Sequence, residues 1–223
     1  MDPVKIDSIV RSKRKTIALI ITPDAKLVVR APLRTSTACI DKLVAEKSAW
    51  IRRKIAEIAE RTVAEKKQFI DGEEFLFLGK NYQLKITSDS LPGAELGEHL
   101  YVSGKTGPEV HRQVYGWYRT QAGKIIGDRC LVWAKIVGRT PTSIRISHAT
   151  RRWGSCSTRG TLCFSWRLIL VPLEIIDYVI VHELAHLIHH NHSKRFWDTV
   201  GTVMPDYRER KNWLKINERM LTI

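Results

Sequence analysis

The alternation of apolar and polar positions divides the chain into a β-rich N-terminal part and a C-terminal part made mainly of helices. Residues 15–21 and 26–30 are rich in β-branched side chains and flank a short turn sequence, which predicts a hairpin. Residues 75–78 and 82–86 flank a glycine-containing turn and predict a second hairpin. We therefore expect strands to prevail in the first part of the chain.

Between the two predicted hairpins, residues 36–67 contain neither Gly nor Pro. Their apolar positions recur at helical spacing, at Ile40, Leu43, Val44, Trp50, Ile51, Ile55, Ile58 and Ala59. This pattern predicts one long amphipathic helix that a Ser or Thr residue opens. Charges of both signs are interspersed on its polar side, which is typical of a solvated face.

The composition changes between residues 88 and 108, where Gly, Ser and Pro are frequent and only residues 100–102 resemble a strand. Such a stretch favours a boundary between two parts of the chain. We therefore expect an N-terminal part, residues 1–107, and a C-terminal domain, residues 108–223.

Within the C-terminal domain, residues 111–137 have the pattern of a long helix. Residues 143–147 and 162–166 resemble strands on either side of a turn-rich segment. Pro172 suits the first turn of the next helix, because proline tolerates a position without a backbone hydrogen bond. Two shorter helices are expected after it. The predicted fold class is α+β, with helices packed on a small sheet.

The predicted helix after Pro172 ends in a histidine cluster that carries the clearest chemistry in the sequence. His182 and His186 lie four residues apart in the pattern His-Glu-x-x-His, so a helix places both imidazoles on one face, where they can bind one zinc ion. Glu183 lies about 100° around the helix from His182. A carboxylate there can accept a proton from a water molecule that the metal activates.

A catalytic zinc ion needs a third protein ligand and an open position. His192 follows His182 by ten residues and is the third ligand we expect. The helix must end before His192, and Asn191 is a plausible stop because asparagine tolerates the left-handed backbone conformation. Three alternative third ligands remain open at this point: His189, His190 and Glu209.

Composition and charge describe a globular chain of 223 residues with a formal net charge of +14. This charge favours encounters with polyanions or acidic substrates. Six arginines and no Lys, Asp or Glu occur between residues 139 and 167, just before the histidine helix. They form either a solvated basic face or a surface that attracts substrate.

Four scattered cysteines, without a Cys-x-x-Cys pair, resemble buried small side chains rather than a disulfide framework, which favours a reducing compartment. The N-terminus lacks the apolar core of a signal peptide, and the longest apolar run is interrupted by Pro172 and Glu174. These features predict a cytoplasmic protein that does not enter a membrane.

A family resemblance extends over nearly the whole chain. Its motifs are Phe77-Leu78-Gly79-Lys80, Trp153-Gly154-Ser155-Cys156-Ser157, Trp166-Arg167-Leu168-Ile169, Asp177-Tyr178-Val179, His182-Glu183-Leu184, His186-Leu187, Asn191-His192-Ser193, Phe196-Trp197 and Pro205-Asp206-Tyr207. Together they resemble the YgjP-like metallopeptidase family. One departure is Ser165, where the resemblance leads us to expect asparagine.

The resemblance implies a zincin-like catalytic domain, distantly related to the SprT-like proteases. It also implies one zinc ion per chain, with His182, His186 and His192 as ligands and Glu183 as the catalytic residue. The first functional hypothesis is therefore a zinc-dependent peptidase that acts on a peptide or protein substrate.

Five further residues are candidates for substrate binding in such a peptidase: Trp153, Gly154, Ser155, Tyr178 and Tyr207. The two tyrosines are candidates for stabilising an oxyanion or for simple packing. Residues 162–166 or 144–147 offer a sheet edge to which a peptide could add as a strand.

The alternative hypothesis is a nucleic-acid or polyanion-binding protein with a structural zinc ion, in which the arginine-rich stretch makes the contacts. No recognised nucleic-acid-binding motif supports it. A glutamate next to a histidine ligand is also unnecessary for a structural zinc site, which usually has four protein ligands.

Overall fold

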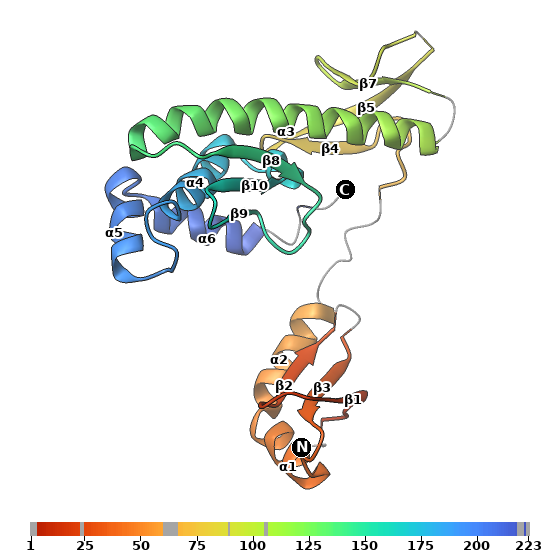
Figure 1. Ribbon diagram of the computed structural model, residues 1–223. Coiled ribbons are helices and arrows are strands. Elements are labelled where there is room, and N and C mark those ends of the chain that lie inside the picture. Colours follow the sequence, from red (N-terminus) through yellow and green to blue (C-terminus); the bar gives the residue numbers. More distant parts are fainter. Residues whose placement is uncertain are drawn as a thin grey trace. The chain divides into compact units, whose positions relative to one another are not determined.

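The computed structural model describes residues 4–22, 25–59, 67–88, 90–104, 107–217 and 221. These residues form an α+β protein that divides into two compact units, Met1–Glu65 and Lys66–Ile223 (Figure 1). Each unit is built around its own cluster of buried apolar side chains.

The first unit contains a sheet in the order β1-β3-β2 and two helices. The predicted hairpin is confirmed, because β2 (Ala18–Ile21) pairs antiparallel with β3 (Leu27–Pro32). A further strand, β1 (Ser8–Ser12), pairs parallel with β3 on its other side. Apolar residues of β3 share a core with residues of the helices, namely Leu27, Val29, Ala31, Ile40, Val44 and Ile51.

The single helix predicted over residues 36–67 is wrong in one respect, because the described part forms two helices, α1 (Thr37–Glu46) and α2 (Ser48–Ala59). The break is at Lys47, whose φ of −98° and ψ of 8° depart from helical values. The break lies between Val44 and Ile51, both buried in the same core. Residues 60–66 lie outside the described residues.

The second unit begins with a four-stranded sheet in the order β4-β5-β7-β6. Its strands are β4 (Glu74–Phe77), β5 (Lys80–Thr87), β6 (Glu95–Leu96) and β7 (Leu100–Ser103). The predicted second hairpin is confirmed by the antiparallel pairing of β4 with β5. Its two-residue turn, Leu78-Gly79, has positive φ at both positions, which is the signature of a type I′ turn.

This sheet shares its core with the long helix α3 (Gly107–Val137). Phe75, Phe77 and Leu84 belong to the same buried cluster as Tyr118 of α3, whose hydroxyl donates a hydrogen bond to the Leu76 carbonyl (2.7 Å). The compact units therefore divide near residue 65, whereas the Gly- and Ser-rich composition indicated a boundary between residues 107 and 108.

A three-stranded sheet follows α3, in the order β8-β10-β9. Its central strand, β10 (Thr161–Ser165), pairs parallel with β8 (Ser143–Ser147) and antiparallel with β9 (Gly154–Cys156). The segment that contains β9 was predicted only as a turn-rich loop, because three residues are too few to display strand periodicity.

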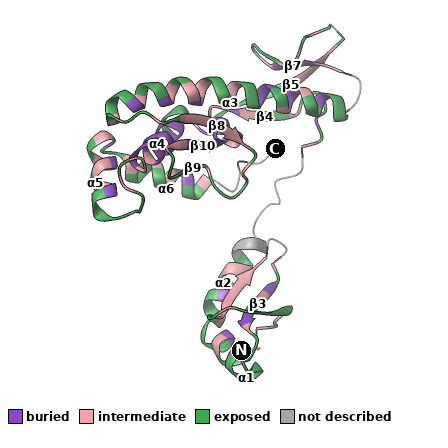
Figure 2. Ribbon diagram, viewed as in Figure 1, coloured by how far each residue is buried: buried purple, intermediate pink, exposed green. Residues whose placement is uncertain are grey.

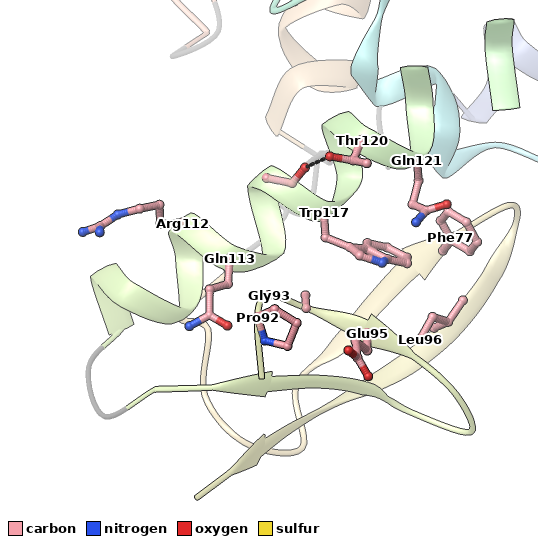
Figure 3. A pocket seen from close by; sticks show the side chains of 12 residues that line it. Phe77, Pro92, Gly93, Glu95, Leu96, Arg112, Gln113, Trp117, Thr120 and Gln121 are labelled. Carbon is pink, nitrogen blue, oxygen red and sulfur yellow. Dashed lines mark hydrogen bonds between the residues drawn. The ribbon is translucent and has the colours of Figure 1, made fainter. Parts of the chain in front are cut away.

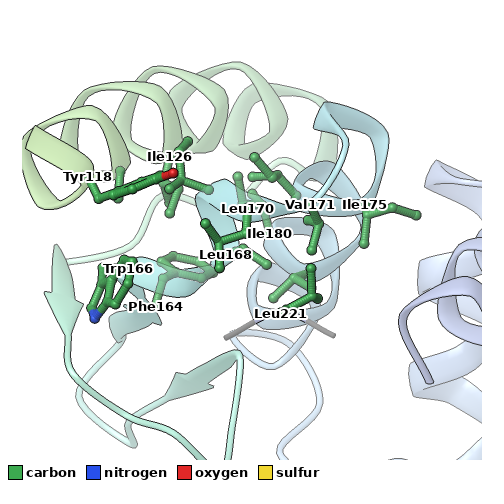
Figure 4. Packing of buried hydrophobic residues seen from close by; sticks show 14 of the residues in the cluster. Tyr118, Ile126, Phe164, Trp166, Leu168, Leu170, Val171, Ile175, Ile180 and Leu221 are labelled. Carbon is green, nitrogen blue, oxygen red and sulfur yellow. The ribbon is translucent and has the colours of Figure 1, made fainter. Parts of the chain in front are cut away.

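The remaining elements complete the second unit: the 3₁₀ helix η1 (Trp166–Leu170) and the helices α4 (Leu173–Ala185), α5 (Lys194–Val203) and α6 (Tyr207–Asn217). Helix α4 is buried along most of its length (Figure 2). Its Ile180 packs in the core near Leu168 of η1, below Tyr118 and Ile126 of α3 (Figure 4). Within the described residues, no helix is long and apolar enough to cross a membrane.

An ion pair also fixes α4 against α3. The Arg129 guanidinium donates from Nε to Asp177 Oδ1 (2.7 Å) and from Nη2 to Asp177 Oδ2. Such two-pronged contacts hold a planar guanidinium in one orientation. Because Asp177 lies on the same helix as the histidine pair, this contact helps to set the position of that helix.

Candidate metal centre

Three histidines converge at the carboxyl end of α4. His182 lies in the last turn of α4, His186 is the residue that caps its carboxyl end, and His192 lies in the loop before α5. The three offer one nitrogen each, and these nitrogens lie within 4.8 Å of one another. The Nε2 atoms of His182 and His192 are 3.0 Å apart. Zinc–nitrogen bonds of about 2.0–2.1 Å in a tetrahedral shell place nitrogens about 3.3 Å apart, so the cluster fits one ion.

Helix α4 ends earlier than the sequence indicated. It stops at Ala185, and the N–H groups of Leu187 and Ile188 turn back to the carbonyls of Leu184 and Ala185, each at 3.0 Å. This early end leaves a loop long enough to return His192 to the helix.

The expectation that Asn191 stops the helix in a left-handed conformation is wrong. Asn191 is not among the described residues with positive φ. Its Oδ1 instead accepts a hydrogen bond from the Ser193 N–H (3.3 Å), which makes a local turn before α5.

Hydrogen bonding and burial prepare the imidazoles to act as ligands. His186 Nδ1 lies 3.0 Å from the His189 carbonyl, and donation to that oxygen leaves Nε2 with its lone pair free. Burial, followed by the neighbouring imidazoles, lowers the pKa of His182 to about 3. Burial likewise lowers the pKa of His186. Both rings are therefore neutral at pH 7, the form that binds metal.

Aromatic side chains of α5 support the three imidazoles. The Phe196 ring lies 4.9 Å from His182, 4.5 Å from His186 and 4.8 Å from His192, measured between centroids. Trp197 stacks on His192 at 5.7 Å. The sequence did not indicate this role. Its only signal is that Phe196 and Trp197 follow His192 by four and five residues.

Glu183 is buried beside the cluster, with 5% of its surface exposed. Burial raises its pKa to about 7, and the charge of Arg152 opposes this effect. Its Oε2 atom has no hydrogen-bond partner among the described residues. A cavity of about 320 Å³ joins this carboxylate to the histidines; its lining residues are Gly154, Ser155, Cys156, His182, Glu183, His186, His190 and His192.

The alternative third ligands lie outside the three-histidine cluster. His189 Nε2 is 3.2 Å from the Thr199 hydroxyl of α5. His190 is exposed and lines the cavity, but the described cluster of potential ligands does not include it. Glu209 lies in the first turn of α6 and is likewise not part of the cluster.

The five residues predicted to bind substrate have different positions. The structure brings Trp153, Gly154 and Tyr178 together in a second cavity beside Glu183, and it places Ser155 in the first. Burial, then the charges of Glu183 and Tyr207, raise the pKa of Tyr178 to about 12, so its hydroxyl stays protonated. Tyr207 instead stacks on Trp197 at 5.4 Å, on α5.

The sheet edge at the site is β9 and not the predicted residues 162–166. Strand β10 is paired on both sides and cannot accept another strand. Among the described strands, only β10 pairs with β9, so β9 has one free edge, and its residues Gly154 to Cys156 line the cavity with the histidines. Residues 144–147 do lie on an edge strand, β8, but none of them lines that cavity.

Two residues outside the cluster hold the loop that leads into β9. The hydroxyl of Ser165, at the position where asparagine was expected, donates to the Ala149 carbonyl (2.7 Å). Arg167 donates to the Thr150 carbonyl (3.0 Å) and lies over the Trp153 ring (5.2 Å). Arg167 therefore has a structural contact, while the other five arginines of the basic stretch are exposed.

A larger cavity of about 940 Å³ lies between α3 and the region of β6, where Trp117 and Phe77 face Pro92 and Glu95 (Figure 3). None of the three clustered histidines lines it. The chemistry described above therefore belongs to the smaller cavity at the end of α4.

Comparison with known proteins assigns the chain to a family. A family model described as the YgjP-like metallopeptidase domain matches residues 15–217. The chain belongs to the YgjP-like family. The resemblance and the zincin-like α+β fold class predicted from the sequence are thereby confirmed. Membership in the YgjP-like family supports a metal-dependent hydrolase with a peptide or protein substrate.

No curated protein matches the chain. Among solved structures, the chain is similar to the metallopeptidase zymogen abylysin of Pyrococcus abyssi, with 25% sequence identity and a TM-score of 0.38. The match covers 41% of this chain and 92% of abylysin.

Proposed function

We propose that this YgjP-like protein is a zinc-dependent peptidase in which His182, His186 and His192 hold one zinc ion and Glu183 is the general base and acid. The observation that carries the proposal is the position of a buried carboxylate beside three convergent imidazoles, within one cavity. Family membership supports the same class of reaction.

The donor set favours zinc in a catalytic role. Three imidazole nitrogens with no thiolate match the shell of catalytic zinc, which keeps one position open. When bound, zinc would polarise the scissile carbonyl and lower the pKa of a water molecule.

Glu183 supplies the proton transfers. In the metal-free chain, burial raises the pKa of Glu183 to about 7, so this carboxyl group holds a proton more tightly than an exposed one and is suited to pass it on. Its unpartnered Oε2 accepts a proton from the attacking water and returns it to the leaving nitrogen. Gly154 approaches Glu183 so closely that an added Cβ would lie 2.6 Å from Glu183 Cγ. The backbone of β9 therefore limits the positions that the carboxylate can take.

The free edge of β9 aligns the substrate. A peptide that adds to this edge as a strand passes Gly154 and therefore passes Glu183 and the histidines. We assign Tyr178 to the substrate side, since it lines the adjoining cavity. We assign Tyr207 to support of the cluster through Trp197.

Substitution of His192, with His189 as the matched control, tests the proposal. We expect His192→Ala to weaken zinc binding by more than about a hundredfold and to abolish cleavage of an unfolded protein such as casein. His189→Ala should retain both properties, because the His189 side chain contacts Thr199, and the contact of His189 with His186 is made by its backbone carbonyl, which alanine keeps. Full zinc affinity in His192→Ala would contradict the ligand set, and casein cleavage at the wild-type rate would contradict the mechanism.

No specific contact among the described residues favours the hypothesis of a structural zinc ion. Within the described residues, three potential ligands come together, whereas structural zinc usually has four. Association of the positively charged surface with nucleic acid stays a prediction, as does a cytoplasmic location.

A further inference from the structure

A second cavity adjoins the histidine cluster and differs from the first in chemistry. It has a volume of about 200 Å³ and shares Gly154, His182 and Glu183 with the cavity of about 320 Å³. The rest of the first cavity carries imidazoles, a hydroxyl and a thiol. The rest of the second is aromatic and aliphatic, and consists of Trp153, Tyr178, Val179 and Leu214.

We propose that this second cavity, here named the apolar side pocket, receives the side chain of a residue next to the scissile bond. The enzyme would then select peptides with leucine, methionine or phenylalanine at that position. This inference rests on the proposed peptidase function and adds the class of substrate to it.

The pairing of β9 directs a peptide toward the apolar side pocket. The Ser165 N–H donates to the Trp153 carbonyl (2.8 Å), and the Ser157 N–H donates to the Thr161 carbonyl (2.9 Å). Hydrogen bonds alternate along an antiparallel strand, so the backbone groups of Gly154 and Cys156 point to the free edge. A peptide paired there lies beside Glu183, and its alternate side chains point to the same face of the sheet.

The size of the apolar side pocket suits one medium-sized side chain. A cavity of about 150 Å³ with apolar walls is known to hold a benzene molecule, so about 200 Å³ accommodates a leucine side chain or a phenyl ring. Tyr178, Val179 and Leu214 are each at most 8% exposed, so these walls are already fixed by packing.

The charge of the apolar side pocket excludes ionised side chains. Glu183 is the one carboxylate among its described lining residues, which include no Lys or Arg. An acidic substrate side chain would lose its hydration among apolar walls and meet the Glu183 carboxylate, with no Lys or Arg on the wall to pair with it. A basic side chain would pair with Glu183 and so occupy the group that must accept a proton.

Leu214 offers a way to change the apolar side pocket without touching the histidines. It lies on α6, which packs against α4, and it is the one lining residue from that helix. A larger side chain at this position should fill the pocket, and alanine should enlarge it. Ile216 is a matched control, since it lies on the same helix, is 64% exposed and does not line the pocket.

The test begins with the full-length zinc enzyme and a degenerate peptide library, in which mass spectrometry locates the cut bonds. Matched peptides with Leu, Phe, Ala, Asp or Lys at the selected position then give kcat/KM values. We expect Leu and Phe to exceed Ala by about 10- to 200-fold, and Asp and Lys to fall below Ala. Leu214→Trp should lower kcat/KM for the Phe peptide by about tenfold more than for the Ala peptide. Ile216→Trp should leave the order unchanged.

Leu214→Ala gives a second readout, because it should raise the preference for Phe over Leu. Calorimetry of the same peptides with Glu183→Gln measures binding without hydrolysis and should give the same order of affinity.

Hydrolysis without an apolar preference, or Leu214 variants that behave like Ile216→Trp, would overturn the apolar side pocket and leave the peptidase function intact. Preferential binding that Leu214→Trp abolishes, without any hydrolysis, would support the pocket and contradict the peptidase. The absence of both hydrolysis and binding would overturn both.

Discussion

At the scale of single residues, the close approach of Gly154 to Glu183 positions the catalytic carboxylate. An added Cβ at Gly154 would lie 2.6 Å from Glu183 Cγ and 2.7 Å from its Oε1, so Gly154→Ala must displace the carboxylate. A displacement of about 1 Å costs about a hundredfold in rate, and we expect a loss of that size in kcat with little change in zinc affinity.

Casein cleavage and zinc titration of the same preparation measure these two effects. Gly123→Ala is the control, because its added Cβ meets nothing within 4 Å, and it should retain activity. Wild-type activity in Gly154→Ala would show that the contact does not position Glu183.

Burial of Glu183 also predicts a pH-dependent stability of the metal-free protein. Its pKa rises from 4.5 when unfolded to about 7 when folded, so the folded state holds the proton more tightly. The free energy of unfolding therefore falls as pH increases from about 4.5 to about 7. Glu183→Gln removes this penalty, and should stabilise the metal-free protein by about 3 kcal/mol at pH 8 but by almost nothing at pH 4.

Urea denaturation at both pH values, with a chelator present, measures the difference. An equal difference at pH 4 and pH 8 would show that the Glu183 carboxylate carries no burial penalty.

The sequence predicted those site residues that a single helix brings together. His182, Glu183 and His186 follow from helical geometry alone. The approach of Gly154 to Glu183 depends on a strand about 30 residues earlier in the chain. The position of His192 depends on where α4 ends, and the sequence placed that end at Asn191 instead of Ala185. Local patterns do not contain these long-range contacts.

At the scale of elements, the turn between β4 and β5 connects the first sheet of the second unit to the histidine helix. The N–H groups of Leu78 and Gly79 donate to the carbonyls of Ile169 and Leu170, at 2.9 and 3.1 Å. Gly79 has a φ of +77°, and an added Cβ would lie 2.7 Å from Pro172 Cγ, just before α4.

Gly79→Ala should therefore combine backbone strain with a steric clash. Gly72 has a similar φ of +82° but nothing within 4 Å, so Gly72→Ala measures the strain alone. We expect a loss of about 1 kcal/mol for Gly72→Ala and about 2–4 kcal/mol for Gly79→Ala, by chemical denaturation. Equal losses would mean that the contact with Pro172 has no energetic role.

Elements with clear periodicity were predicted well, and elements that depend on distant partners were not. Both hairpins, α3 and β8 follow from the sequence with small changes of their ends. Strand β9 was missed because it exists through its pairing with β10. The break at Lys47 was missed because the sequence there contains neither Gly nor Pro.

At the scale of the whole molecule, the two separate cores predict that the second unit folds by itself. The buried clusters of the units share no residue. A fragment of residues 66–223 should unfold cooperatively and bind zinc. A fragment of residues 108–223 should not, because it lacks Phe75, Phe77 and Leu84 from the same core as Tyr118.

Circular dichroism during thermal unfolding and zinc titration of both fragments test this division. A cooperative transition in the fragment of residues 108–223 would support the boundary that composition indicated. Composition and the shared core favour different boundaries, because the Gly- and Ser-rich stretch before residue 108 surrounds two strands of the shared sheet, β6 and β7.

The most direct test of the peptidase assignment is the kcat/KM of Glu183→Gln for a cleaved peptide, measured on protein of known zinc content. Glu209→Gln is the matched control, since Glu209 is exposed and outside the histidine cluster. We predict that Glu183→Gln binds one zinc ion per chain and loses about 10²- to 10⁴-fold in kcat/KM, while Glu209→Gln retains wild-type values. Undiminished hydrolysis by zinc-bound Glu183→Gln would contradict the proposed function.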